Sequence, residues 1–281
     1  MTEQVELPPT EGWRQFFPGN APLFSTRRAN TEPRLECVRH RFEPLLCELH
    51  AHSRWSDGVL TVGQLADLYG RSGFDVLCVT DHTVRDDDPW RGSDGWVDRS
   101  VGPETWSRYA AEIEREASRA RATYGMLVVP GLELTFNDED PAMAAHAVAV
   151  GLRRFVSVDA GMADAIRIAA DSGAAIVAAH PFDGRQETFR TRLTEGFARD
   201  DVLRGLVHRF ELFNRTQLFA WVAETGLPAV ATGDFHRPEH LGGWKTLVPT
   251  RRDETALVDY LRSQRPAYLT RLEADAPLLA A

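Results

Sequence analysis

The sequence has 281 residues, of which 43% are hydrophobic and 26% charged, and its 41 acidic and 32 basic residues give a net charge of −9. At roughly 100–200 residues per domain, this length allows two small domains or one large α/β barrel. The composition is that of a globular protein, while the acidic excess argues against an extended nucleic-acid partner and against an anionic membrane surface.

Residues 1–43 are rich in proline, arginine and glutamate and show no sustained hydrophobic period. We interpret them as an N-terminal extension packed on a single barrel domain that spans residues 44–281. The first residues lack the basic start and apolar run of a signal peptide, and no segment approaches the ~18 apolar residues of a membrane span. The three cysteines, Cys37, Cys47 and Cys78, form no paired framework, so we expect reduced thiols and a cytoplasmic protein.

Short apolar runs then alternate with helix-like segments along the chain. The runs are Leu45–Leu49, Val76–Val79, Met126–Leu132, Ala147–Leu152, Ala174–Ala179, Leu206–Phe213 and Ala229–Ala231. The helix-like segments are Val62–Ser72, Glu104–Tyr124, Asp159–Ser172, Thr216–Thr225 and Asp253–Ser263. The runs show little alternation of polar and apolar residues, which is typical of parallel strands buried on both faces. The pattern predicts an α/β barrel of about seven strands.

Two segments depart from this alternation. Only residues Asn137–Ala145 separate the third run from the fourth, whereas a crossover between parallel strands takes roughly a dozen residues or more. Those two runs therefore pair antiparallel, or the barrel is distorted there. Residues Asp86–Pro103 form a long, polar loop with tryptophans. Loops of this length in compact domains are either functional or mobile, and its role stays open at this stage.

Histidines and carboxylates gather where the runs end or begin. Nine such side chains fall there: His50, His52, Asp57, His82, Glu133, His146, His180, Asp234 and His236. Because residues two apart in an extended strand point to the same side, His50 and His52 can chelate one ion together. Burying so many titratable groups at one rim is costly unless metal ions supply partners for them. The neighbouring Asp81 is expected to orient a histidine or to cap a helix.

The order of these motifs resembles that of the polymerase and histidinol-phosphatase (PHP) family. The matching segments are HAHSRWSDG (50–58), TDH (80–82), GLE (131–133), His146, AHP (179–181) and GDFH (233–236), and the resemblance covers about residues 44–250. Members of this family are metal-dependent phosphoesterases. The resemblance therefore implies that activity and a distorted (β/α)7 barrel with its active site at the C-terminal rim of the strands.

The resemblance also implies three sets of metal ligands. His50, His52, Glu133 and Asp234 would hold one ion, Glu133 would bridge to a second ion held by His146 and His180, and Asp57, His82 and His236 would hold a third. Mixed imidazole and carboxylate ligands suit Zn, Mn or Fe, so we expect two or three divalent transition-metal ions. A hydroxide bridging two ions would attack phosphorus in line. Asp234, Glu133 and His236 are the expected catalytic residues.

Four further residues are candidates for binding the substrate, namely Arg185, Arg215, Asn214 and Trp55. Arginine suits a phosphate group because its planar fork donates two parallel hydrogen bonds. We expect a small phosphorylated metabolite or nucleotide as the substrate and no membrane partner, and the oligomeric state stays open. The alternatives are a phosphodiesterase or exonuclease acting on short oligonucleotides, and a non-catalytic metal-binding module.

Overall fold

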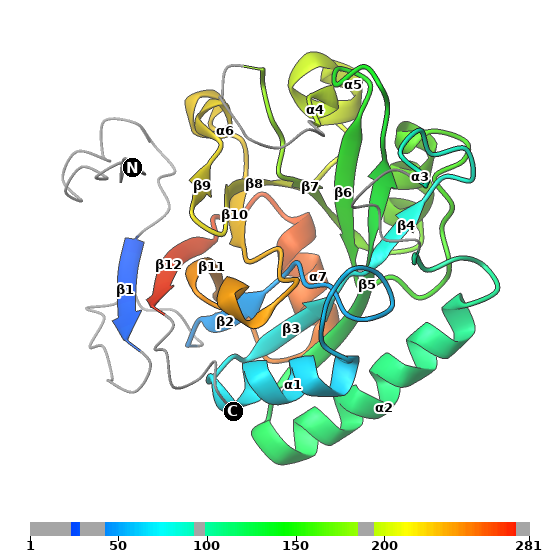
Figure 1. Ribbon diagram of the computed structural model, residues 1–281. Helices are drawn as coiled ribbons and strands as arrows, with labels where there is room; N and C mark the ends of the chain where they lie inside the picture. Colours follow the sequence, from blue (N-terminus) through cyan, green and yellow to red (C-terminus); the bar gives the residue numbers. More distant parts are fainter. Residues whose placement is uncertain (1–23, 29–42, 93–98, 185–193, 274–281) are drawn as a thin grey trace, which may run out of the picture.

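A computed structural model of the chain describes residues 24–28, 43–92, 99–184 and 194–273. One curled, mixed sheet runs through the described residues, with helices around its outside (Figure 1). Its strands, in spatial order, are β1 (Phe24–Arg28), β12 (Tyr268–Glu273), β11 (Gly243–Val248), β2 (Leu45–Glu48), β3 (Val76–Val79), β5 (Leu127–Phe136), β6 (Ala145–Val150), β7 (Ala175–Ala179), β8 (Arg209–Asn214) and β10 (Ala229–Thr232). Two short strands lie off this path: β4 (His82–Val84) pairs with β5, and β9 (Gln217–Leu218) pairs with β8.

The strand directions confirm an α/β fold with a distortion where the sequence predicts one. Strands β2, β3 and β5 are parallel neighbours, as are β7, β8 and β10. Strand β6 is antiparallel to both β5 and β7, because the connection after Phe136 is too short for a crossover. The register places Glu133 opposite Val148, and Phe136 opposite Ala145. The end of β5 and the start of β6 therefore lie at the same edge of the sheet.

All seven predicted runs form strands, but the repeat is less regular than a (β/α)7 barrel. Strand β11 is antiparallel to both β2 and β12, and none of β1, β4, β9, β11 and β12 was expected. Between β7 and β8 the described residues hold only two four-residue helices, α4 (Gly196–Arg199) and α5 (Asp201–Arg204). The coarser prediction of a mixed α/β fold is confirmed, and the regular alternation of strands and helices is present only in part.

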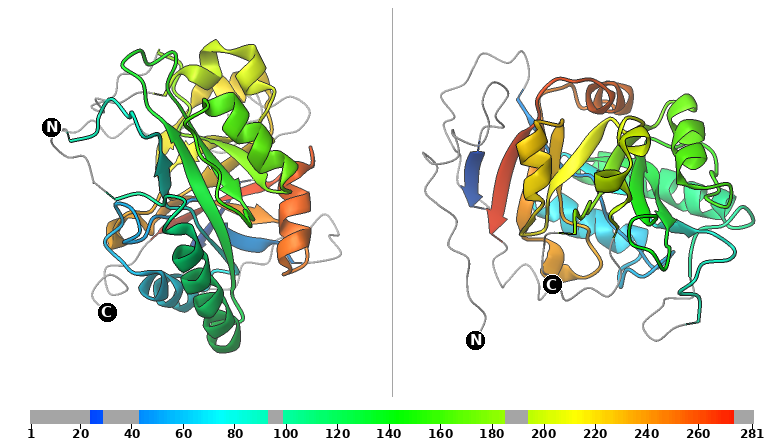
Figure 2. Two further views of the ribbon diagram at one scale, coloured as in Figure 1. Left: turned by 90° about the vertical axis from the view of Figure 1, so that its right-hand side faces the viewer. Right: turned by 90° about the horizontal axis from the view of Figure 1, so that it is seen from above.

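The longer helices begin and end at residues with clear local reasons. They are α1 (Val62–Arg71), α2 (Trp106–Tyr124), α3 (Met162–Asp171), α6 (Ala220–Thr225) and α7 (Glu254–Arg262), with a 3-10 turn at Pro238–His240. Thr61 and Gln64 form a capping box at the start of α1. Gly125 and Gly226 take left-handed conformations after α2 and α6, at φ 65° and 69°. Figure 2 shows these helices on different sides of the curled sheet.

Two hydrophobic clusters cover the two faces of the strands. One cluster joins the strands to α1, α2, α3 and α6, and the other joins the opposite strand faces to α7. In β2, for example, Leu46 belongs to the first cluster, while Leu45 and Cys47 belong to the second. Both faces are thus buried, which explains the continuous apolar runs. Arg209, at the start of β8, donates to the carbonyls of Tyr260 and Leu261, so α7 lies at the end of the sheet where the parallel strands begin.

The curl brings β10 against β11, and the segment after β10 against the segment after β2, a junction that we call the seam. Side chains replace part of the backbone ladder there. The Thr246 hydroxyl of β11 accepts a hydrogen bond from Ala231 N–H (2.9 Å) and donates one to the Ala231 carbonyl (2.7 Å). Beyond the strand ends, His52 N–H donates to the Phe235 carbonyl (2.8 Å), and Phe235 N–H donates to the His50 carbonyl (3.1 Å). The segment after β2 therefore lies beside the segment after β10.

Parts of two predicted segments lie outside the described residues. Of the predicted N-terminal extension, residues 1–43, the structure describes only β1 and residue 43, and β1 pairs parallel with β12. Within the polar loop 86–103, residues 93–98 lie outside the described part. The division into an extension and a single barrel domain stays a prediction. Among the described helices, none is both long and apolar enough to cross a bilayer.

Candidate metal centre

The nine side chains predicted as metal ligands converge at one end of the sheet. They form three adjoining groups: His50, His52 and Asp234; Glu133, His146 and His180; and His52, Asp57, His82 and His236. Within each group the ligand atoms lie within 4.8 Å of one another. The end of the sheet that carries them is the one where the parallel strands finish, opposite α7. The ends of strands thus place all three groups together, as the sequence pattern predicts.

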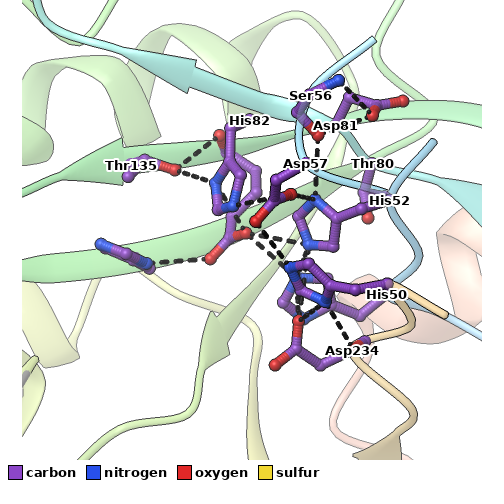
Figure 3. A network of polar contacts seen from close by, with 12 residues as sticks. His50, His52, Ser56, Asp57, Thr80, Asp81, His82, Thr135 and Asp234 are labelled. Atoms are coloured by element: carbon purple, nitrogen blue, oxygen red, sulfur yellow. Dashed lines mark hydrogen bonds and ion pairs between the residues drawn. The ribbon is translucent and has the colours of Figure 1, made fainter. Parts of the chain in front are cut away.

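The first group is buried (Figure 3), and one oxygen of Glu133 lies beside it. His50 Nε2 and His52 Nε2 are 3.0 Å apart, and each lies 3.2 Å from Glu133 Oε2. Asp234 Oδ1 lies 3.7 Å from His50 Nε2 and 3.5 Å from His52 Nε2. Ligands at about 2.0–2.2 Å from a tetrahedral ion are roughly 3.3–3.6 Å apart. These four atoms therefore fit around one first-row transition-metal ion.

The second group shares Glu133 with the first. Glu133 Oε1 lies 3.0 Å from His146 Nδ1 and 3.1 Å from His180 Nε2. The two oxygens of this fully buried carboxylate therefore face different groups. This arrangement would suit a carboxylate between two ions, which is the role that the sequence resemblance implies for Glu133.

The third group is centred on Asp57 and is the more open one. Asp57 Oδ1 lies 3.6 Å from both His52 Nδ1 and His82 Nε2, and Asp57 Oδ2 lies 2.9 Å from His236 Nε2. The side chains of Asp57, His82 and His236 are 24%, 20% and 19% exposed, whereas His50 and His52 are fully buried. His52 faces the first group through Nε2 and this group through Nδ1, so the structure adds it to the predicted set of three ligands.

The charges of the site are strongly coupled. Burial alone would raise the pKa of the Glu133 carboxyl, but His82 and His50 outweigh it and hold that pKa well below its usual range. Asp234 is likewise held well below its usual pKa against the effect of burial, by His236 and His50. Conversely, burial opposes protonation of His52, yet hydrogen bonds to Asp234 and Glu133 raise its pKa to about 10. The protonated imidazole of His52 thus places a positive charge beside the two carboxylates, where a bound cation would supply it.

Two features of the donor atoms show that the residues fit a metal ion. Asp57 Oδ1 is buried and has no hydrogen-bond partner, although two imidazole nitrogens face it at 3.6 Å. That spacing is too long for a hydrogen bond and suits two ligands of one ion. The paired Nε2 atoms of His50 and His52 likewise face each other at 3.0 Å, with only carboxylate oxygens around them. Imidazole and carboxylate donors together suit Zn, Mn or Fe.

Glu211 is a buried carboxylate of β8 that the sequence pattern did not single out. Its Oε1 accepts from His50 Nδ1 (2.8 Å) and Thr232 Oγ1 (2.6 Å). Its Oε2 accepts from His180 N–H (2.7 Å) and from the Asn214 amide (2.9 Å). Because Nδ1 of His50 donates to Glu211, Nε2 carries the lone pair that faces the first group. A single glutamate inside the apolar run RFELF was the only signal in the sequence.

Asn137 and Asp88 likewise determine which ring nitrogen of His146 carries its proton. The Asn137 amide nitrogen donates to Asp88 Oδ2 (2.9 Å), so the Asn137 amide oxygen must face His146 Nε2 (2.9 Å). An amide oxygen only accepts, and therefore Nε2 carries the proton. The other nitrogen, Nδ1, then points its lone pair at Glu133, where a cation is needed between the two acceptors. Asp88 belongs to the polar loop 86–103, which thereby contacts the site.

Asp81 holds the turn after β2 and neither caps a helix nor contacts an imidazole directly. Its Oδ1 accepts from Ser53 N–H (2.8 Å), Ser56 N–H (3.0 Å) and Ser56 Oγ (2.7 Å), and its Oδ2 accepts from Ser53 Oγ (2.7 Å). Ser56 Oγ in turn lies 3.3 Å from His52 Nδ1. Asp81 therefore fixes the turn that carries Asp57.

Backbone strain is concentrated at the site. Among the described residues, the non-glycine residues with positive φ are His180 (30°), Asp234 (42°) and Arg215 (56°). A side chain rarely adopts this region unless its surroundings hold it there, and such residues cluster at functional sites. Two of the three are predicted metal ligands, and the third contacts one of them.

The four predicted substrate-binding residues have different surroundings. Arg215 donates from Nη2 to the Asp234 carbonyl (2.8 Å) and carboxylate (3.1 Å), and its side chain is 29% exposed. Asn214 is 2% exposed and donates to Glu211, a placement that favours a supporting role over contact with substrate. Trp55 donates to Glu112 Oε2 of α2 (2.9 Å) and packs edge-on against Tyr109, so its indole points toward α2. Arg185 lies outside the described residues.

Comparison with known proteins yields a similarity in fold. No protein-family model matches the sequence, and no curated protein matches it either. A solved structure from Bacteroides vulgatus, described as a two-domain protein containing a predicted PHP-like metal-dependent phosphoesterase, is similar with a TM-score of 0.54. It shares 21% identity over 87% of this chain and 69% of its own. A Bifidobacterium adolescentis structure whose name suggests a metal-dependent phosphoesterase has a TM-score of 0.42 and 15% identity, over 68% of this chain and 87% of its own. The likeness to the Bacteroides vulgatus structure shows that the chain has a PHP-like fold.

Proposed function

We propose that this protein is a metal-dependent phosphoesterase whose nine converging side chains bind two or three divalent transition-metal ions. The observation that carries the proposal is the first group, where two imidazole nitrogens and two carboxylate oxygens face one another at 3.0–3.7 Å. A single cation placed among these atoms would satisfy all four of them at once. The fold supports the same function, because the similar Bacteroides vulgatus protein is described as PHP-like.

Within this proposal, the predicted metal ligands and Arg215 each have a part in the reaction. When bound, divalent ions supply an activated water at neutral pH and stabilise the charge that develops on a phosphoryl group. Glu133 holds two ligand groups at a fixed separation, and Asp234 and His52 complete the buried one. His236 and Asp57 lie on the more exposed side, so the substrate approaches there. Arg215 is partly exposed beside His236 (3.3 Å), which supports its assignment as a phosphate contact.

The proposed substrate is a small phosphorylated metabolite or nucleotide, and the proposed location is the cytoplasm. The net charge of −9 supports a small substrate over an extended nucleic acid, because a long polyanion would be repelled by the acidic surface. Short oligonucleotides stay an alternative substrate, since their ends can reach the exposed third group.

The proposal is tested by assaying phosphate release from a panel of monoesters, with bis-p-nitrophenyl phosphate and short oligonucleotides as diesters. We expect hydrolysis of monoesters that is abolished by a chelator and restored by Zn²⁺, Mn²⁺ or Fe²⁺. Faster hydrolysis of the diesters would favour the phosphodiesterase alternative. No hydrolysis of any ester with any of the three metals would contradict the proposal and leave a non-catalytic metal-binding module.

A further inference from the structure

A fully buried ion pair lies in the seam next to the first group. Lys245 Nζ of β11 is 2.7 Å from Glu48 Oε2, at the end of β2, and both side chains have no exposed surface. Lys245 is the only lysine in the sequence, and the rest of its 32 lysine and arginine residues are arginines. Burying such a pair costs desolvation and is weak evidence for a stabilising role. Its position therefore points to what the carboxylate holds in place.

The Glu48 carboxylate connects the two sides of the seam. Its Oε1 accepts from Gly233 N–H (2.7 Å) and from His50 N–H (3.3 Å). Gly233 follows β10 and His50 follows β2, and these strands are not neighbours in the hydrogen-bonded order of the described sheet. The carboxylate thus provides an acceptor where no neighbouring strand provides a carbonyl. Its second oxygen accepts from Tyr69 of α1 (3.0 Å) and so is held in orientation.

The backbone that Glu48 holds is the backbone that presents Asp234. Asp234 has φ 42°, a conformation that needs support from its surroundings. Arg215 supports it on one side by donating to the Asp234 carbonyl (2.8 Å). Glu48 supports it on the other side through Gly233 N–H. A Cβ at Gly233 would collide with both the Glu48 carboxylate and the Lys245 ammonium, so the pair occupies the space beside the glycine backbone.

We infer that Glu48 and Lys245 form a positioning pair, which fixes Asp234 against His50 so that their ligand atoms converge on one ion. This inference rests on the proposed metal-binding function. Glu48 does the positioning through its acceptor oxygen, while Lys245 balances the buried charge with a compact ammonium. The planar guanidinium of arginine is larger and has a different hydrogen-bond geometry. That difference gives a physical reason for lysine at this one position in a chain that otherwise uses arginine.

Two double variants separate positioning from stability. Glu48→Gln/Lys245→Met removes both charges but keeps an acceptor oxygen for Gly233 N–H. Glu48→Leu/Lys245→Met removes both charges and the acceptor. The two variants share the loss of the ion pair, so a difference between them reports the loss of the polar end of the side chain at position 48. The readouts are the number and affinity of tightly bound Zn²⁺, from competition with a chromogenic chelator, and thermal unfolding of each folded variant.

We expect the Glu48→Gln/Lys245→Met variant to bind Zn²⁺ like the wild type. The Glu48→Leu/Lys245→Met variant should bind one Zn²⁺ at least about tenfold more weakly, as is usual when a group that orients a ligand is lost. Equal Zn²⁺ binding by the two variants would overturn the inference. If the leucine variant does not fold, Gly233→Ala takes its place, and unchanged Zn²⁺ binding there would equally overturn it. Absence of Zn²⁺ binding by the wild type would instead contradict the proposed function, and this inference with it.

Discussion

His50 shows how single residues build the site. Its Nδ1 donates to Glu211, its N–H lies 3.3 Å from Glu48, and its Nε2 faces His52 and Glu133. Each of these contacts restricts one degree of freedom of a fully buried imidazole. An imidazole held in this way loses little entropy when it binds an ion, which is one reason why loss of a partner of a metal ligand typically lowers the metal affinity about 10–100-fold.

Removing one ligand of the first group should abolish turnover without unfolding the chain. We expect His50→Ala and Asp234→Ala each to lower kcat/KM by more than about 100-fold, beyond what loss of an orienting group costs. The matched control is His208→Ala, because the His208 imidazole accepts from Ile176 N–H, away from the site. Steady-state kinetics and circular dichroism check the result. Activity close to wild type in either ligand variant would show that the site is assigned wrongly.

Glu211→Gln tests the carboxylate behind His50. Glutamine keeps the shape but loses the charge that fixes the His50 Nδ1–H tautomer, so we expect about 10–100-fold weaker metal binding with the fold retained. Glu112→Gln is the control, because Glu112 lies on α2 and accepts from the Trp55 indole rather than from a predicted ligand. Chelator competition measures both variants. Equal affinity of the two would rule out an orienting role for Glu211.

The predicted ligands and their supporting residues differ in how visible they are in the sequence. His50, His52 and Asp234 were predicted because they occur in short motifs at the ends of apolar runs. Glu211 and Glu48 were not, because each is one polar residue within an apolar run, and only the curl of the sheet shows what it contacts. Sequence spacing reports neighbours along a strand, whereas these contacts join residues more than 150 positions apart.

At the scale of elements, the polar loop 86–103 after β4 contacts the site, a role that the sequence alone did not assign to it. Asp88 reaches Asn137 in the β5–β6 connection, and Asn137 sets the tautomer of His146. The loop is thus connected to the second group through one side-chain amide. Asp87, its neighbour, instead pairs with Arg85 and is 85% exposed.

This contact predicts different effects for two adjacent aspartates. Asp88→Ala frees the Asn137 amide to rotate, so part of the His146 population presents Nδ1–H to Glu133. We expect metal affinity to fall about tenfold, the lower end of the range for orienting groups. Asp87→Ala should leave the affinity unchanged. Nitrogen-15 NMR of the histidine side chains reads the tautomer directly, and an unaltered His146 tautomer in Asp88→Ala would contradict the account.

The elements themselves were predicted unevenly, for physical reasons. The seven runs became strands because both of their faces are buried, so every position is apolar. Strand β11 was missed because its buried side chains include Lys245 and Thr246, whose partners Glu48 and Ala231 come from other strands. Helices α4 and α5 have four residues each, too few for a helical period to show. The antiparallel pairing of β5 and β6 followed from loop length alone.

At the scale of the whole molecule, the coupled charges predict how stability depends on pH. His52 has a pKa raised to about 10, so its stabilising contribution is complete below pH 6.5 and is lost as the pH rises toward 10. His208 is the opposite case. Burial, Arg262 and Arg209 lower its pKa to about 4, so its contribution is complete above pH 6.5 and is lost as the pH falls toward 4.

We therefore expect the free energy of unfolding of the metal-free protein to be largest near pH 6.5, and to fall toward both pH 5 and pH 9. Bound ions replace the proton on His52, so the loss toward pH 9 should disappear when Zn²⁺ is present. Urea unfolding with and without chelator at pH 5, 6.5 and 9 measures this. Rising stability of the metal-free protein from pH 6.5 to 9 would contradict the assigned charges.

At this scale the net charge of −9 also has to be counted together with the cations that the site would bind. Asp57, Glu133 and Asp234 contribute three of the negative charges and face the places where cations would bind. Two or three bound divalent ions would outweigh the charge of these three carboxylates, which favours a phosphate there even though the protein is acidic. The curl of the sheet makes this possible, because it joins ligands from both ends of the sequence.

The central claim is that three adjoining groups of side chains bind divalent ions, and anomalous X-ray diffraction at the zinc absorption edge tests it most directly. We predict two or three anomalous peaks in crystals grown with Zn²⁺: one among His50, His52 and Asp234, one among Glu133, His146 and His180, and, with full occupancy, one beside Asp57. Crystals of the Asp234→Ala variant should lose the first peak. No peak at any of the three groups, in protein that is folded and crystallised with Zn²⁺, would contradict the account.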